Sequence, residues 1–534
     1  MRSRKTGLTR WLRASTMATL ALLAYAAGMA AASAESVLTV AMTAADIPDW
    51  AGQPDQGFEG YRFVGYSLYD GLVNWDLSRA DREVAIKPGL ATGWHVDPHD
   101  PKRWIFKLRH DVKFHDGCAW NADAAVWNLV RLTDRNSPAF SPVYFARARA
   151  RTGDIDKVEK VSDDTIAITT RTVNSLFPYN LPYVLMISKC AVDAAKNNYA
   201  VFSQHPAGSG PYRFARVVPH QRLELVKNPS YWDPARVPKH DRLVLLPMPE
   251  ATTRAAALLS GEVNFIEAPS PDMLPELRQA GMHVVTNVYP HTWPYLFNLQ
   301  HGPFSDARVR EAANLAVDRD AMVALLSGLA KPSYGALVPS QAAYGNVPAI
   351  HTDPAKATAL LKDAHCYPCE IHVAISPSGS GQMQPLPMNE LVKSQLDAAG
   401  FKVVFDTIDW NAMTDVFVKG AAAYPKYDAI NFSMGVMDPL SLLKAVEKVY
   451  AAPNGTNWGG LDDARIDALG QRVLSTFDAQ QQQALLTQIH QLYAADAARL
   501  FIVSDLNPRA LAPNLSGYVE AQSWFQDLTP IVVH

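Results

Sequence analysis

Residues 104–117 read Trp104-Ile-Phe-Lys-Leu-Arg-His-Asp-Val-Lys-Phe-His-Asp-Gly117, and after Cys118-Ala-Trp120 the chain continues as Asn121-Ala-Asp-Ala-Ala-Val-Trp-Asn128. The alternation of apolar and polar side chains over 104–109 predicts a β-strand. The Asp116-Gly117 dipeptide favours a turn, so we interpret His115-Asp116-Gly117 as structural and not as an acid/base pair. Asn121 is a good N-cap, and a helix is predicted over 122–132.

Strand and helix signals alternate in the same way through the rest of the chain, which favours layers of an α/β fold. Period-2 patterns predict strands over 37–42 and 165–170. A helix capped by Ser305 is predicted to carry Val309, Ala312, Ala313, Ala316 and Val317 on one stripe. Helix 391–399 is expected to stop at Gly400 and to lead into a strand over 401–405.

Length and composition exclude several classes of protein. The chain has 534 residues, which favours about three domains. Apolar residues make up 48% and charged residues 19%, enough to build large cores. The net charge is −3, so there is no basic excess with which to neutralise a nucleic-acid backbone. No nucleic-acid partner is expected.

The first 34 residues have the composition of a secretory signal peptide. They hold five basic residues and no acidic one, an uncharged apolar run over 14–28, and Ala32-Ser-Ala34 as a cleavage site. A membrane anchor is the weaker alternative, because a span needs about 20 apolar residues. Cleavage after Ala34 leaves 500 residues with a net charge of −8. We expect a periplasmic protein exported by a cleaved N-terminal signal peptide.

The sequence holds four cysteines, an even number that favours disulfides in an oxidising compartment. Cys366 and Cys369 form a CxxC between a helical stretch (355–364) and a strand-like one (370–375). A structural disulfide on a turn is favoured there over a redox or metal site. A redox site would need a helix N-terminus to stabilise the thiolate. Cys118 and Cys190 are a second candidate pair by elimination.

The common catalytic and cofactor motifs are absent. The sequence has no HExxH, GxSxG, GxxxxGK[ST] or complete GxGxxG. His95 and His99 are four residues apart, but Pro98 between them breaks a helix. No catalytic residue, metal site or cofactor is therefore predicted.

Several segments together resemble the peptide/nickel/opine-binding class of periplasmic solute-binding proteins of ABC transporters, the extracellular solute-binding protein family 5. The resembling segments occur in family order, run from about Val37 to Val533, and include residues 104–128. Asn264 stands where the family usually has Asp. The further segments are Gly208-Ser-Gly-Pro-Tyr-Arg-Phe214, Lys227-Asn-Pro-Ser-Tyr-Trp-Asp233, Gly261-Glu-Val-Asn264, Pro303-Phe-Ser-Asp-Ala-Arg-Val-Arg-Glu-Ala312 and Ala316-Val-Asp-Arg-Asp320.

The resemblance implies an α/β fold with two lobes joined by a hinge, and an extra inserted domain in lobe one. By position, the lobe I core is expected to comprise 35–75, 206–297 and 504–534. The inserted domain would be 76–205, and lobe II would be 298–503. A cleft between domains is also where ligands generally bind, and hinge closure captures them.

The resemblance also bears on the solute. In the dipeptide-binding branch an Asp holds the ligand amine and an Arg holds its carboxylate. Counting along the chain places Gly435 and Gly379 at those positions. No acid occurs within 431–437 and no Arg or Lys within 371–384, so both charge-assisted bonds are missing. A longer or modified peptide, an opine-like or sugar-derived molecule is favoured over a standard dipeptide.

Other residues are candidates to line the cleft. Acidic and aromatic side chains follow the first strand. Arg147, Arg149 and Arg151 would share one face if their segment is extended, and they would suit an anionic ligand. Neutral amides and methionines occur further along the chain. For each residue a solvated loop or core packing is the alternative. The candidate ligand-binding residues are Asp46, Glu59, Tyr61, Arg62, Arg147, Arg149, Gln382, Trp410, Asn411, Met434, Gly435 and Trp458, with Asp49, Asp55, Gln384, Asn389 and Met437 beside them.

We therefore predict a solute-binding receptor, not an enzyme. It would capture a peptide-like or other small organic solute between two lobes and deliver it to ABC permease subunits in the inner membrane, acting as a monomer. Two alternatives stay open at this point. One is an exported hydrolase whose motif is dispersed in sequence, and the other is a chemoreceptor-type binding protein without a transport role.

Overall fold

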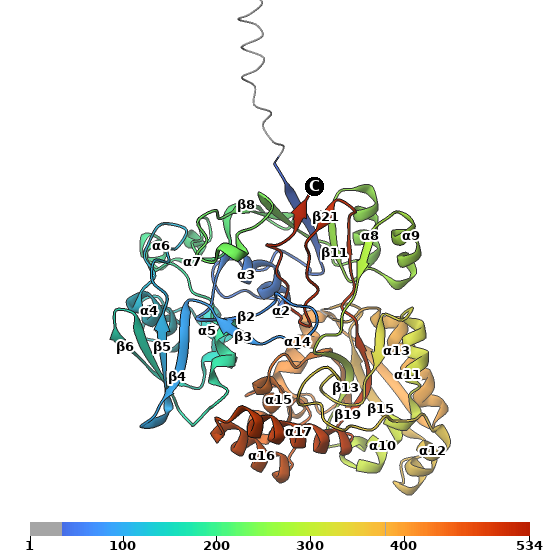
Figure 1. Cartoon of the computed structure of the whole chain (residues 1–534). Coiled ribbons are helices and arrows are strands. Elements are labelled where there is room, and N and C mark those ends of the chain that lie inside the picture. The colour runs from blue at the N-terminus through green and yellow to red at the C-terminus, as the bar shows by residue number, and fades with distance from the viewer. Residues whose placement is uncertain (1–34, 380) are drawn as a thin grey trace, which may run out of the picture. The chain divides into compact units, whose positions relative to one another are not determined.

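The computed structural model describes residues 35–379 and 381–534 (Figure 1). The predicted signal peptide, 1–34, lies outside the described residues. Contacts divide the chain into 1–36 and 37–534, and the following description concerns the second unit. In its described part, no helix combines the length and the apolar character that a membrane span requires.

A first seven-stranded sheet has the order β12-β20-β11-β1-β10-β9-β8. The opening strand β1 pairs in parallel with both β10 and β11, and its Leu38 and Val40 side chains are fully buried. Its strands are β1 (Val37–Met42), β8 (Tyr212–Val218), β9 (Arg222–Lys227), β10 (Arg242–Pro247), β11 (Phe265–Glu267), β12 (His283–Val285) and β20 (Arg509–Leu511).

A second seven-stranded sheet has the order β14-β19-β13-β17-β15-β16, with β18 paired to β13. Its strands β15, β16 and β17 run parallel, and their buried faces pack against amphipathic helices that include α10 (Ala307–Ala316) and α13 (Pro385–Ala398). Its strands are β13 (His291–Phe297), β14 (Ala330–Pro332), β15 (Cys369–Ile375), β16 (Phe401–Thr407), β17 (Ala429–Asn431), β18 (Met434–Gly435) and β19 (Arg499–Asp505).

A four-stranded antiparallel sheet, β4-β5-β7-β6, contains the strand that was predicted over 104–109. The predicted strand is β5, and the predicted helix is α4, whose N-cap Asn121 accepts a hydrogen bond from the Ala124 amide at 2.9 Å. The elements are β4 (Ala91–Asp97), β5 (Asp100–Leu108), α4 (Ala122–Thr133), α5 (Pro142–Thr152), β6 (Ile155–Ser162) and β7 (Thr165–Thr170).

The cores follow the same division. One apolar cluster joins the first sheet to the four-stranded sheet, and a separate cluster underlies the second sheet. This arrangement gives the mixed α/β architecture that was predicted. Strand β13 belongs to the second sheet. The sequence had placed its residues at the end of the lobe I segment 206–297. The domain boundaries stay a prediction.

Two local predictions were wrong. The stretch that holds Arg147, Arg149 and Arg151 is not extended but forms α5, because Ser141 caps the segment and Pro142 is at its first position. The three guanidinium groups therefore do not share one face. The helix expected after Ser305 is capped instead by Asp306, whose side chain accepts from the Arg308 amide at 2.8 Å.

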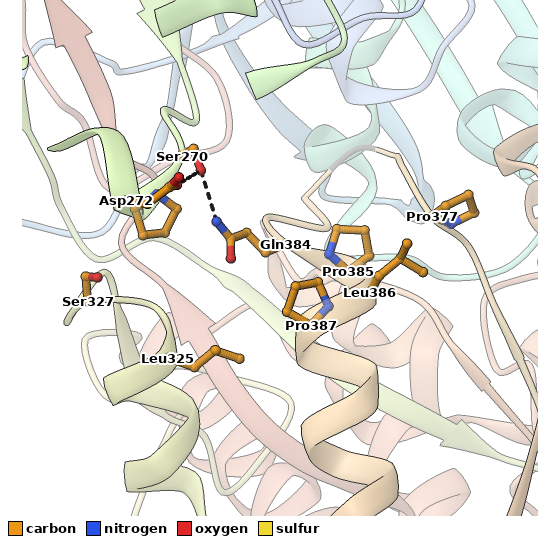
Figure 2. A pocket seen from close by; sticks show the side chains of 10 residues that line it. Ser270, Asp272, Leu325, Ser327, Pro377, Gln384, Pro385, Leu386 and Pro387 are labelled. Carbon is orange, nitrogen blue, oxygen red and sulfur yellow. Dashed lines mark hydrogen bonds between the residues drawn. The ribbon is translucent and has the colours of Figure 1, made fainter. Parts of the chain in front are cut away.

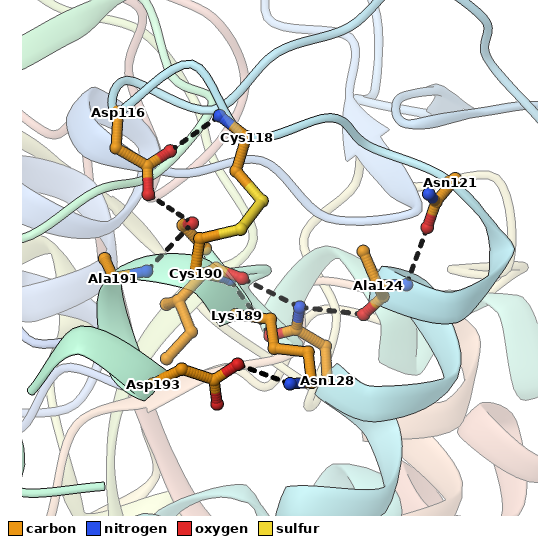
Figure 3. The surroundings of a disulfide bond; sticks show 11 residues. Asp116, Cys118, Asn121, Ala124, Asn128, Lys189, Cys190, Ala191 and Asp193 are labelled. Carbon is orange, nitrogen blue, oxygen red and sulfur yellow. Dashed lines mark hydrogen bonds and ion pairs between the residues drawn. A yellow bond between two sulfur atoms is a disulfide. The ribbon is translucent and has the colours of Figure 1, made fainter. Parts of the chain in front are cut away.

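The predicted disulfide between Cys366 and Cys369 is confirmed, and it lies between α12 (Pro354–Asp363) and β15 as expected. Cys118 and Cys190 form a second bridge (Figure 3), 72 residues apart in sequence. Asp116 accepts hydrogen bonds from the Cys118 amide at 3.0 Å and from Ser188 Oγ at 2.6 Å. The His115-Asp116-Gly117 turn is thus part of the clamp that ties β5 and α4 to α6 (Lys189–Ala194).

The remaining elements connect these sheets and cover their faces. The helix predicted over 391–399 is longer than expected, and Gly400 follows it with φ 105°. The helices are α2 (Phe58–Gly60), α3 (Tyr66–Leu68), α6 (Lys189–Ala194), α7 (Tyr199–Phe202), α8 (Ala251–Ser260), α9 (Leu274–Gln279), α10 (Ala307–Ala316), α11 (Arg319–Leu325), α12 (Pro354–Asp363), α13 (Pro385–Ala398), α14 (Trp410–Lys419), α15 (Pro439–Val446), α16 (Ala464–Ser475) and α17 (Ala479–Ala495). Short strands and helical turns complete the set: β2 (Val73–Trp75), β3 (Ile86–Pro88), β21 (Leu515–Ser516), β22 (Val532–Val533), η1 (Tyr61–Gly65), η2 (Phe177–Tyr183), η3 (Pro234–Arg236), η4 (Pro271–Met273), η5 (Pro303–Ser305), η6 (Ala421–Ala423) and η7 (Lys448–Tyr450).

Candidate functional site

A cavity of about 420 Å³ lies between segments that follow strands of the two large sheets (Figure 2). In α/β sheets ligands bind beyond the carboxyl ends of the strands. One wall of this cavity comes from residues just after β11, and another from residues after β15. Its volume lies within the range of about 300–1,000 Å³ that is usual for small-molecule sites. The lining residues are Ser270, Pro271, Asp272, Leu325, Ser327, Pro377, Gln384, Pro385, Leu386 and Pro387.

A short chain of hydrogen bonds joins the two walls. Gln384 Nε2 donates to Ser270 Oγ at 3.0 Å, and the Ser270 hydroxyl donates to the Asp272 carboxylate (Figure 2). Ser270 is buried, whereas Asp272 is exposed. Asp272 is the single ionisable residue among the ten that line the cavity. The walls are otherwise apolar, with four prolines and two leucines.

A second group of side chains surrounds the start of β13. His291 and Thr292 pair with Gly435 and Met434, and Gln382 accepts a hydrogen bond from the Trp293 indole N–H at 2.6 Å. The buried His291 ring lies 3.1 Å from the Asp505 carboxylate, measured from Nδ1 to Oδ2. Gln382, Met434 and Gly435, all predicted from sequence, are therefore brought together here.

Phe58 joins this group from the segment that follows β1 of the first sheet. It stands in α2, and its ring packs with Tyr183, Trp524 and Phe525 at centroid distances of 6.1, 5.9 and 5.3 Å. A Cβ atom on Gly435 would lie 3.1 Å from Phe58 Cε2. Phe58 and Gly435 are both half-buried. The side chain nearest to Gly435 is therefore an aromatic ring and not a carboxylate.

Glu59 and Arg62, two further predicted residues, belong to a buried charged cluster. Arg62 contacts Glu59 at 2.7 Å and Glu267 at 2.5 Å, and Arg509 pairs with Glu520. Burial raises the pKa of the Glu520 carboxyl to about 7 and also raises that of Glu267. These groups pair with one another within the protein, and they fix the segment after β1 against β11 and β20.

The structure disperses most of the other predicted residues. Asp46 contacts His220, Arg147 pairs with Asp49 at 2.6 Å, and Arg149 is exposed. Tyr61 is buried, with its hydroxyl 3.2 Å from the Gln53 amide. These four residues do not line the cavity.

The predicted tryptophans have different surroundings. Trp410, at the start of α14, stacks on Phe432 with centroids 5.1 Å apart and supports the backbone at Gly379. Asn411 beside it is exposed. Trp458 is core: it is buried, and its indole N–H donates to the Val416 carbonyl at 3.1 Å.

Sequence reasoning missed most of the cavity. No recognisable motif contains Ser270, Asp272, Leu325 or Leu386. Gln384 is the one cavity residue that the sequence analysis named as a candidate. Phe58, His291 and Trp524 were missed as well. Their positions in the chain were the one available indication, because Ser270 and Gln384 each follow a buried strand. To use this indication, one must know that the two strands end at facing places.

A contact between α5 and α15 joins the four-stranded sheet's helices to the second sheet's side of the molecule. Lys444 Nζ donates to the Ala150 carbonyl at 2.6 Å and to Asn180 Oδ1 at 3.2 Å. Arg151 covers the Tyr183 ring at 3.7 Å and lies 3.9 Å from Asp438. Burial, together with the nearby Arg151 charge, lowers the pKa of Lys444 to about 7.

Comparison with known proteins now identifies the family. The model of the bacterial extracellular solute-binding proteins, family 5, matches residues 85–446. The chain belongs to this family. The glutathione-binding protein GsiB of Pectobacterium atrosepticum is 28% identical over 505 residues, which cover 90% of this chain and 94% of that protein. The di/tripeptide-binding protein 2 of Pseudomonas aeruginosa is 25% identical, covering 87% and 90%.

Solved structures of the same fold cover this family-5 chain almost completely. The periplasmic binding protein DppA of Helicobacter pylori, in complex with the peptide STSA, matches with a TM-score of 0.80 at 21% identity, over 93% of this chain and 98% of that one. AgaA of A. tumefaciens in complex with agropinic acid matches with a TM-score of 0.75 at 20% identity, over 93% and 99%. The resemblance and the two-lobed α/β fold predicted from sequence are thus confirmed, and this family-5 protein is a solute-binding component of an ABC importer.

Proposed function

We propose that this protein captures its solute between the segments that follow β11 and β15 and delivers it to a membrane permease. The cavity of about 420 Å³ at this place carries the proposal. It draws its walls from both large sheets, so a hinge motion that separates the sheets opens it and the reverse motion encloses the solute.

The group around β13 extends this binding region. Gln382 and Gln384 stand on the same loop after β15, one toward Trp293 and the other toward Ser270. Phe58, Met434 and Gly435 then provide an apolar continuation. We assign the ligand-binding role to these residues and to the cavity lining, and we assign structural roles to Trp458 and Arg147.

The solute is a small organic molecule, and a peptide-like one is supported by the named relatives, which bind glutathione and di/tripeptides. The sequence has no acid within 431–437 and no Arg or Lys within 371–384, and the cavity lining contains no Lys or Arg. A zwitterionic dipeptide held at both charged ends is therefore disfavoured. The protein acts as a monomer in the periplasm after loss of residues 1–34.

The named relatives are binding proteins, which favours the receptor over the hydrolase that the sequence left open. Among the described residues, no group of three His, Cys, Asp or Glu is placed to hold a metal ion. The chemoreceptor alternative uses the same site, and uptake assays separate the two roles. Loss of solute uptake on deletion of the gene supports transport, whereas unchanged uptake with altered chemotaxis supports signalling.

Native mass spectrometry of the freshly purified protein, followed by a thermal-shift screen, tests the proposal. A solute at about 100 times its Kd stabilises the folded form by roughly 2.7 kcal/mol, which raises Tm measurably. Peptides, opines and sugars form the screen. If none of them raises Tm, no solute is retained, and one of them is hydrolysed, the receptor function is wrong.

A further inference from the structure

In the part of the chain that the structure describes, two short segments connect the two large sheets. Residues 286–290 lead from β12 of the first sheet to β13 of the second, and residues 506–508 lead from β19 of the second back to β20 of the first. The Asn287 amide donates to the Leu506 carbonyl at 2.9 Å and joins the two connections. Residues 291–505 are therefore the part that a hinge motion turns against the rest of the chain.

Leu176 crosses this division. It belongs to the loop before η2, outside 291–505, and 1% of its surface is exposed. Its side chain lies in an apolar cluster with residues of α15, α16 and α17. Among the described residues, the other buried members of this cluster all lie within 336–501. Leu176 is thus withdrawn from water by the turning part, and its burial favours the closed arrangement.

Ser175, the preceding residue, contacts the C-terminal end of α16. Its amide donates to the Leu474 carbonyl at 2.8 Å. Its hydroxyl donates to the Val473 carbonyl at 2.9 Å and accepts from Gln482 Nε2 at 2.8 Å. The last carbonyl groups of a helix lack partners within the helix and take them from elsewhere. Donors from across the division therefore serve this end of α16.

Lys444 makes the reciprocal contact from α15. Its Nζ donates at 2.6 Å to the Ala150 carbonyl, which belongs to the last turn of α5 (Figure 1). Each part thus supplies a donor to a helix end of the other part. Glu83 adds a further contact, because its carboxylate accepts from the Ala342 amide at 3.0 Å. These residues are not among those that line the solute cavity, so their contacts do not require a solute.

The loop around Leu176 is held in shape from its own side of the division. Asn174 Oδ1 accepts from the Leu176 amide at 3.1 Å, and Asn174 Nδ2 donates to Asp154 at 2.9 Å. The Trp104 indole N–H donates to the Asn174 carbonyl at 3.3 Å. These partners all lie outside 291–505, so they are kept when the parts separate. A loop that is ordered beforehand loses little conformational entropy when it docks.

We propose that residues 174–176 are a latch that holds the turning part closed without solute, so that the unliganded protein populates a closed form. The inference rests on the proposed function and adds a means by which the protein regulates it. A ligand that binds the closed form gains apparent affinity from any prior population of that form. The latch therefore raises the affinity for the solute without touching it.

Small-angle X-ray scattering of the full protein, freed of retained solute by denaturation and refolding, tests the latch. The wild type is expected to contain the closed form. Leu176→Ala should lower the ratio of closed to open molecules about tenfold, because it removes most of the buried apolar side chain. Ser175→Ala, which removes the hydroxyl bonds and keeps the amide bond, should lower it about fivefold.

Two matched controls should keep the wild-type ratio. Ser475→Ala removes a hydroxyl from the same end of α16, but this hydroxyl donates to the Gln471 and Arg472 carbonyls of its own helix. Val161→Ala removes an apolar side chain from β6 that is 52% exposed. The controls therefore separate a contact across the division from a general effect of the substitution.

A solute-free wild type that scatters as the open form alone overturns the latch. So does a Leu176→Ala or Ser175→Ala variant with native circular dichroism and an unchanged ratio. If Leu176→Ala does not fold, Ser175→Ala decides, because it removes no apolar packing. The solute screen tests the receptor function separately. A protein whose closed fraction follows these substitutions, but which binds no solute, overturns the proposed function and leaves the latch in place.

Discussion

Lys444 Nζ lies 2.6 Å from the Ala150 carbonyl oxygen, so α15 is joined to the last turn of α5 by a partly buried ammonium group. The carbonyl groups at the C-terminal end of a helix favour a cation. Burial and Arg151 oppose the charge, and the pKa of Lys444 is lowered to about 7. The same contact is thus sensitive to pH near neutrality.

The sign of this dependence follows from linkage. An exposed lysine has a pKa of about 10.4, so between about pH 7 and 10.4 the unfolded chain binds more protons at Lys444 than the folded one. Its contribution to stability therefore rises with pH in this window, by at most about 1.4 kcal/mol per pH unit. We expect the Tm difference between wild type and Lys444→Met to shift in favour of the wild type from pH 7 to pH 9.

Lys402→Met is the control for this prediction, because Lys402 is 65% exposed and pairs with Glu370 at the surface. Its Tm difference from the wild type should be nearly the same at both pH values. If the Tm difference between the wild type and Lys444→Met is the same at pH 7 and pH 9, the lowered pKa of Lys444 is contradicted.

Gly381 is predicted to tolerate no side chain. Its φ is 69°, and a Cβ there would lie 2.5 Å from His291 Nε2 and 2.6 Å from Trp524 Cη2. Gly117 has a similar φ of 88°, but no atom lies within 4 Å of its Cβ position. Both alanine variants meet backbone strain of about 1 kcal/mol. We expect Gly381→Ala to lower Tm clearly more than Gly117→Ala and to weaken solute binding, and equal Tm losses would contradict the close approach.

The local elements were predictable because their signals are local. Asn121 caps α4 as expected, and Cys366 bonds to Cys369 across one turn. The α5 error had a local cause too: alternating Arg and Ala over 147–151 satisfies a period of two, but the Ser141-Pro142 start signal favours a helix. The family resemblance then supplied the α/β, two-lobed class.

The cavity could not be predicted in this way. Ser270 and Gln384 are 114 residues apart, and their hydrogen bond exists because β11 and β15 end at facing places in two different sheets. Nothing in either segment encodes the other. Conversely, Asp46 and Arg149 have suitable chemistry close to predicted strands, but their side chains find partners or solvent elsewhere. Residue type narrowed the candidates, and topology decided among them.

The two disulfides are expected to differ in their contribution to stability. Cys118 and Cys190 close a loop of 72 residues, whereas Cys366 and Cys369 are 3 residues apart. In the chain-entropy description these loops correspond to about 4 and about 2 kcal/mol. We expect Cys118→Ala/Cys190→Ala to lower the free energy of unfolding more than Cys366→Ala/Cys369→Ala, as measured by urea denaturation. The reverse order would show that strain or residual structure outweighs loop length.

Phe58 and Gly435 define the last prediction, which concerns the apolar continuation of the cavity. The Cβ of an alanine at position 435 would lie 3.1 Å from Phe58 Cε2 and 3.5 Å from Met437 Sδ, so small side chains displace the ring slightly and larger ones displace it fully. Gly435→Val should therefore weaken binding of the solute more than Gly435→Ala. Phe58→Ala should also weaken it, since it removes the ring to which the proposed function assigns a contact with the solute.

Gly93→Ala is the matched control, because no atom lies within 4 Å of its Cβ position in the four-stranded sheet. It should leave the Kd unchanged. Restoring space by combining Gly435→Val with Phe58→Ala should recover part of the lost affinity if steric contact between these two residues is the cause, because contacting residues show non-additive effects. Strictly additive losses in this cycle, measured by titration calorimetry, would show that the two side chains act on the solute independently.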